Sequence, residues 1–226
     1  ALVAIIFAIA SCKADIPADT PLPPPDVPPK GNFIVFYSDT EFTVTPYNGW
    51  SGGTESALEF STDPNKSWTK LTAENLQQTA VKTDDKYYLY FRGANNNTMG
   101  ADFDNHWSLT GSNVYCSGNI ENLLDYKTVE NGVHPQMKES CFSYMFHECT
   151  SLETAPELPA TALASDCYEG MFYGCTSLAT APELPATTLA SDCYANMFSG
   201  CTSLIQAPEL PATTLANNRC YDGMFS

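Results

Sequence analysis

Residues 141–166 read CFSYMFHECTSLETAPELPATALASD, and residues 167–192 repeat the pattern as CYEGMFYGCTSLATAPELPATTLASD. Residues 193–219 continue it as CYANMFSGCTSLIQAPELPATTLANNR, with one extra residue, and residues 220–226 begin it again as CYDGMFS. The period of the repeat is therefore 26 residues. Repeats of this length are typical of solenoids, in which each unit buries its apolar face only against its neighbours.

Each unit is expected to form a short parallel strand and a short helical turn. The strand begins at the Leu of the C-T-S-L motif and ends at the prolines of A-P-E-L-P, which have no N–H to donate. The segments 166–174 and 192–200 start with Asp and end with Gly, a pattern that favours a helical turn. The apolar positions of the motif form the expected structural core: Met145, Phe146, Cys149, Leu152, Met171, Phe172, Cys175, Leu178, Met197, Phe198, Cys201 and Leu204.

The cysteines follow the repeat, because eight of the nine lie after position 115. Two columns are expected, one made of Cys141, Cys167, Cys193 and Cys220, the other of Cys149, Cys175 and Cys201. We expect reduced, buried thiols that pack as small apolar groups. Disulfides between coils about 5 Å apart are the alternative. No zinc site is expected, because its ligand spacing of C-x2–4-C is missing.

The repeat resembles the leucine-rich repeat of BspA-like bacterial surface proteins. The resemblance rests on the M-F-x-x-C-T-S-L core and the A-P-E-L-P segment, and it covers residues 141–226. The chain departs from that pattern where it carries Ala-Pro-Glu-Leu-Pro, since many relatives have Ile-x-Ile-Pro. The resemblance implies a non-enzymatic surface protein that binds or adheres to a host or microbial surface protein or glycan.

The first residues indicate export. Residues 1–11 read ALVAIIFAIAS and precede Cys12. This apolar run is shorter than the roughly 20 residues that span a bilayer, and it fits part of a signal peptide. The ending Ile9-Ala10-Ser11-Cys12 resembles a bacterial lipobox, which implies lipidation at Cys12 and a place at the outer membrane or cell surface. An ordinary signal with a chance Cys is the alternative.

Residues 13–30 form a proline-rich linker, with seven prolines in 18 positions. Such a segment stays extended and would lift the following body off the membrane. Residues 31–126 are expected to form a β-sandwich, and residues 127–226 a repeat domain that continues beyond position 226. The fold class is therefore mixed, with an N-terminal all-β sandwich followed by a leucine-rich-repeat solenoid.

The sandwich is predicted from short β-branched and aromatic runs between Asn, Gly, Asp and Pro clusters. These runs are 32–38, 41–46, 57–61, 67–71, 86–92, 106–109 and 113–117. Residues 61–68, STDPNKSW, resemble an Asp-box hairpin, which we interpret as structural. A short helix is expected over 119–126.

Two groups of side chains are candidates for a ligand surface. Trp50, Tyr88, Tyr90 and Trp107 would form an aromatic platform for sugars, or else belong to the core. Glu157, Glu183 and Glu209 recur in A-P-E-L-P and would form an acidic column, or else a solvated edge. Asp102, Asp104 and Asn105 lie close together but lack the EF-hand spacing of a calcium site.

Charge excludes one class of partner. The chain carries 26 acidic and 10 basic residues, for a net charge of −16. Nucleic-acid binding needs clustered Lys and Arg and is not expected. No catalytic constellation appears among the residues, and no cofactor is implied. The leading hypothesis is thus a lipid-anchored adhesion protein. The alternative is a carbohydrate-binding component of a surface nutrient-capture system.

Overall fold

The computed structural model describes residues 31–215 and 219–226, so the expected signal peptide, the lipidation site Cys12 and the proline-rich linker lie outside the described residues. Ten strands and one helix are assigned in the described part of the chain. The strands are β1 (Ile34–Ser38), β2 (Thr43–Thr45), β3 (Ser51–Ser61), β4 (Thr69–Lys70), β5 (Gln78–Thr79), β6 (Val81–Thr83), β7 (Lys86–Thr98), β8 (Ser108–Thr110), β9 (Val114–Ser117) and β10 (Leu152–Thr154). Helix α1 (Asn122–Glu130) follows β9.

One sheet dominates the fold. It has the order β10-β9-β1-β7-β3-β4, with β6 also paired to β7, and a second sheet has the order β5-β2-β8. Strand β1 is buried along its whole length and runs antiparallel to both β7 and β9. Its side chains alternate between faces, so that Ile34 and Phe36 join the main core, whereas Val35 and Tyr37 join a smaller cluster on the other face.

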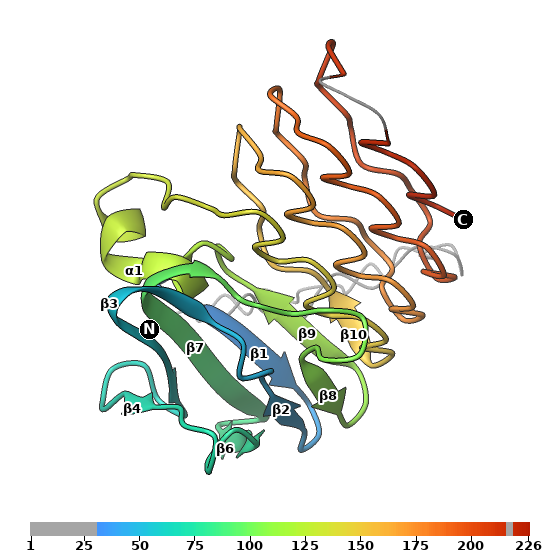
Figure 1. The fold of residues 1–226 in the computed structure, drawn as a ribbon. Coiled ribbons are helices and arrows are strands. Elements are labelled where there is room, and N and C mark those ends of the chain that lie inside the picture. The colour runs from blue at the N-terminus through green and yellow to red at the C-terminus, as the bar shows by residue number, and fades with distance from the viewer. Residues whose placement is uncertain (1–30, 216–218) are drawn as a thin grey trace, which may run out of the picture.

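The repeats form a stack of coils that grows away from this sheet. We call residues 141–166, 167–192 and 193–219 the first, second and third coil. Figure 1 shows them, in yellow to red, stacked beside the blue-to-green sheet. Within the described residues, the first coil alone supplies a strand, β10, which pairs in parallel with β9. One buried apolar cluster runs from β1 through all three coils.

The expected helical turns are wrong, because the backbone alternates between two kinds of hydrogen bond. The amides of Phe142, Tyr144 and Phe146 donate to carbonyls of the second coil, at 2.8–2.9 Å. The amides between them, those of Ser143 and Met145, donate to the carbonyls three residues earlier in the chain. Left-handed backbone recurs every fourth residue in each coil, for example at Asp166, Gly170 and Gly174. An α-helix cannot contain such positions, so these segments are successive turns.

The expected fold class is therefore wrong as a whole. The N-terminal strands and the repeats do not form a separate sandwich and a strand-and-helix leucine-rich-repeat solenoid, since β9 and β10 belong to one sheet over one core. Helix α1 precedes the repeats, and its dihedral angles break at Asp125. Strands β3 and β7 are longer than predicted, and β5 and β6 lie in segments where no strand was predicted.

The N-terminal part also supplies a coil-like segment that carries no repeat motif. The amides of Met99, Trp107, Val114 and Ile120 all donate to carbonyls between Cys141 and Glu157, at 2.8–3.0 Å. These bonds match those that join one coil to the next. The ring of Trp107 lies 6.0 Å from that of Phe146, so it takes the place of the phenylalanine of a preceding coil. Residues 99–120 thus cap the first coil.

Candidate functional site

The Ala-Pro-Glu-Leu-Pro segment of each coil forms a ridge. We call residues 155–159, 181–185 and 207–211 the first, second and third ridge. In the first two ridges the leading proline and the Leu are buried, whereas the Glu between them is exposed. This alternation is that of an extended chain, whose successive side chains point to opposite sides. The first two ridges therefore present one carboxylate to solvent on an apolar base, whereas in the third ridge Pro208 is half-buried and Leu210 is exposed.

Proline explains why the ridges separate from one another. The first and second coils are joined by a bridge between Thr154 and Thr180, and again by the amide of Thr187, which donates to Thr161 at 3.1 Å. Between these points, no backbone hydrogen bond joins the first ridge to the second among the residues that the structure describes. Two of the five residues of each ridge are prolines, which cannot donate to such a bond.

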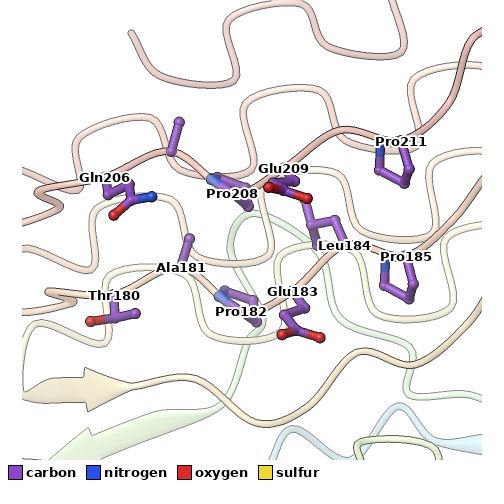
Figure 2. Close-up of a pocket in the computed structure, with 11 residues that line it drawn as sticks. Thr180, Ala181, Pro182, Glu183, Leu184, Pro185, Gln206, Pro208, Glu209 and Pro211 are labelled. Carbon is purple, nitrogen blue, oxygen red and sulfur yellow. The ribbon is translucent and has the colours of Figure 1, made fainter.

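Two open grooves lie between the ridges. The first groove, of about 470 Å³, runs between the first and second ridges. The second groove, of about 540 Å³, runs between the second and third ridges and is also lined by Thr180 and Gln206. Figure 2 shows the second groove, with Pro182 and Pro185 on one wall and Pro208 and Pro211 on the other. The repeat thus builds the same recess twice.

The expected acidic column lies on the rims of these grooves. Glu157 and Glu183 line the first groove, and Glu183 and Glu209 line the second, so Glu183 is shared. All three side chains are exposed. No Lys or Arg lines either groove, and no ion pair involves these three residues within 31–215 and 219–226. The three carboxylates are therefore free to meet an external cation.

The structure does not bring the four proposed platform aromatics together. Trp107 is fully buried in the main core, and Trp50 packs against that core. Tyr88 and Tyr90 lie on the opposite face of the large sheet, in a row with Tyr37 and other rings. Neighbouring rings of this row are stacked with interplanar angles of 14° to 26°. Tyr88 is stacked against Tyr37 and Tyr90, and Tyr90 itself is buried.

The predicted core residues of the repeats form continuous columns. All twelve are buried except Leu204, which is half-buried. The rings of Phe146, Phe172 and Phe198 stack with centroids 5.7 Å apart. A second column consists of Phe142, Tyr168 and Tyr194, at 5.8–5.9 Å. These residues hold the coils at a constant spacing in the core.

The repeat cysteines are free and buried, as expected. In one column, each thiol donates to a carbonyl of the preceding coil: Cys175 to Phe146 and Cys201 to Phe172, both at 3.0 Å. Burial raises the pKa of the Cys149 thiol to about 12 and that of Cys201 to about 11. The thiols are therefore protonated packing groups.

The structure also describes two loops singled out in the sequence, the Asp102–Asn105 group and the hairpin 61–68. The carboxylate of Asp102 accepts hydrogen bonds from the amides of Asp104 and Asn105 and from the Asn105 side chain, so it closes its own turn. In the hairpin 61–68, the Ser61 hydroxyl bonds within the turn and Asp63 accepts from the amide of Asn65. Within the described residues, no group of three or more His, Cys, Asp or Glu side chains could hold a metal ion.

Sequence reasoning missed two polar features. The fully buried carboxylate of Glu121 contacts Nδ1 of His134 at 2.8 Å. His147 is also buried, and neither of its ring nitrogens has a hydrogen-bond partner among the described residues. Sequence reasoning also missed that the prolines of the ridges form the walls of the grooves, although the recurrence of these prolines at fixed positions was a signal for such walls.

Comparison with known protein families, curated proteins and solved structures gives no match. Within the described part of the chain, no helix has both the length and the apolar character needed to span a bilayer. The function must therefore be argued from the geometry of the grooved face.

Proposed function

We propose that the chain is a non-enzymatic binding protein of a bacterial surface, held to the membrane by a lipid on Cys12, and that its grooved face contacts a surface protein. The observation that carries the proposal is the pair of adjacent grooves, built from the same residues in successive coils. A site made once can be incidental to packing. A site made twice at one spacing offers a partner two equivalent contacts.

The lining of the grooves favours a protein partner. Apolar walls with a polar rim are the usual composition of protein interfaces. Two equal contacts on one rigid body also raise affinity without a new type of interaction, because the second contact forms at high effective concentration. The coils provide that rigidity through their stacked rings, and the first two ridges also rest on a buried Leu.

The glycan-binding alternative finds less support in the aromatic residues. Binding to a sugar ring would need an exposed aromatic face. Trp107 is buried, and the faces of Tyr88 and Tyr90 are stacked on neighbouring tyrosines. The protein-binding hypothesis uses surfaces that are open.

An array experiment tests the proposal. The full chain, kept soluble in mild detergent, is applied to immobilised host matrix proteins, microbial surface proteins and glycans. Two blocked variants accompany it, Ala155→Trp for the first groove and Ala207→Trp for the second. Ala73→Trp, an exposed position in a turn far from the repeat, is the control.

The expected result is binding to at least one protein on the array that both blocked variants weaken and the control keeps. The proposal is wrong if binding is confined to glycans, or if Ala155→Trp and Ala207→Trp bind every protein as well as the wild type does. Circular dichroism of each variant shows that the fold is retained.

A further inference from the structure

We propose that each groove takes one basic side chain of an extended peptide, so that the partner segment carries Arg or Lys at alternate positions. This inference rests on the proposed function and names the chemistry of its partner. It follows from three properties of the grooves: their charge, their walls and their spacing.

Charge indicates a cationic group. Each groove lies between two exposed carboxylates, Glu157 with Glu183 or Glu183 with Glu209. Equal charges on adjacent ridges repel each other, and a cation placed between them removes that repulsion. Arg suits the position best, because its planar guanidinium can donate to two carboxylates at once. Lys can fill it as a point charge.

The walls favour a cation with an apolar stem. Each groove is lined by prolines, and the second groove also by Ala181, Leu184 and Ala207. Arg and Lys bury their methylene groups along apolar surface while the charged end stays in water. A small metal cation would leave these walls uncovered, and among the described residues no metal-binding group of three acidic, His or Cys side chains exists.

Spacing decides how the peptide lies. Equivalent rings of successive coils are 5.7 Å apart in the core, and we take this interval for the two grooves above them. In an extended chain, residues i and i+2 are about 6.6 Å apart and point to the same side. A strand that crosses the ridges along the stack can thus place two successive same-side residues in the two grooves.

The test uses the full chain in mild detergent and a synthetic peptide of sequence RARARARA, blocked at both ends and labelled with a fluorophore. Its isomer RRRRAAAA has the same charge and composition but a different spacing. The groove variant is Glu157→Gln/Glu183→Gln/Glu209→Gln. The control variant Glu41→Gln/Glu74→Gln/Glu130→Gln changes the net charge equally, at exposed positions outside the repeats. Binding is measured by fluorescence anisotropy at two salt concentrations.

We expect the alternating peptide to bind the wild type and the control variant at least tenfold more tightly than the groove variant. We also expect it to bind the wild type more tightly than the isomer does. The inference is overturned if both triple variants lose affinity equally, if the isomer binds as well, or if the alternating peptide does not bind. Unchanged thermal melting excludes unfolding as the cause of a loss.

The two proposals can fail separately. If the array shows groove-dependent protein binding while the alternating peptide does not bind, the inference about basic side chains is wrong and the proposed function stands. If the peptide binds in the expected order while no protein on the array depends on the grooves, the grooves recognise basic peptides and the proposed adhesion function is wrong.

Discussion

The thiol of Cys175 donates a hydrogen bond to the backbone carbonyl of Phe146 at 3.0 Å, across the boundary between the first two coils. The carbonyl of Phe146 also accepts the backbone amide of Cys149 at 3.1 Å, so the thiol is its second donor. A cysteine at this position therefore fills space and adds a hydrogen bond between two coils with one atom. This dual role explains why the position in the repeat is Cys and not Ala or Val.

Removing that thiol should weaken folding. Cys175→Ala leaves a small void and removes one of the two hydrogen bonds to the Phe146 carbonyl, so we expect a loss of about 1–3 kcal/mol in the free energy of unfolding. Cys201→Ala removes the equivalent bond to Phe172, but Cys201 is less deeply buried. Urea unfolding should show the smaller loss for Cys201→Ala. An equal or larger loss there would contradict this account of the thiol.

The thiols should also be chemically inert in the folded protein. The thiolate is the reactive form, and burial raises the pKa of Cys149 to about 12 and that of Cys193 to about 11. Iodoacetamide at pH 8 should label the repeat cysteines slowly in the native state and completely after unfolding without reductant. Mass spectrometry reads both states. Disulfide-linked repeat peptides would show that the cysteines are not reduced.

The aromatic column predicts a gradient of stability along the stack. Phe172 is fully buried and stacks on Phe146 and Phe198, whereas Phe225 is 48% exposed and stacks on Phe198. Phe172→Ala should cost about 3–5 kcal/mol. Phe225→Ala should cost much less, because its ring is already half in water. Thermal or urea unfolding of the two variants would disprove the gradient if the losses were similar.

His147 should make the fold sensitive to mild acid. Its ring is buried against Tyr173 and Phe103, and burial, followed by the neighbouring His106, lowers its pKa below the ordinary 6.5, which Glu148 and Asp104 partly oppose. At a pH between the pKa of His147 in the folded chain and its pKa in the unfolded chain, the unfolded chain binds more protons. Stability should therefore fall as the pH drops below about 6.5.

The variant His147→Phe tests this assignment, since it keeps a ring beside Tyr173 and cannot titrate. The free energy of unfolding, measured by urea at pH 7 and pH 5.5, should change less between the two values in the variant than in the wild type. Identical pH profiles would contradict the assignment of the acid response to His147.

Part of this structure could be read from the sequence. The burial of Met171, Phe172 and Cys175 follows from repetition alone, because a residue type that recurs at a fixed period in a stack faces the same neighbours each time. The helical turns could not be read correctly. The same Asp and Gly that suggested helix ends hold left-handed backbone at Asp166, Gly170 and Gly174.

The cap and the candidate site show a different limit. Trp107 acts as the phenylalanine of a preceding coil, but residues 99–120 share no motif with the repeat, so only the three-dimensional ladder reveals it. The glutamates of the ridges were found as a column. The grooves between these glutamates were not predicted. A groove forms because the prolines prevent the backbone hydrogen bonds that would join two ridges, and its width depends on how far the two coils then separate.

The cap formed by residues 99–120 makes the length of the stack an adjustable property. Each coil pairs with the coil on either side through the same backbone hydrogen bonds, and the cap presents such an edge to the first coil. Duplication of one 26-residue unit in the gene would then insert a further coil without altering the sheet. It would also add one groove and one carboxylate, because neighbouring grooves share a glutamate. A change in the number of repeat units would thus change the avidity by one groove at a time, and every contact within a unit would stay as it is.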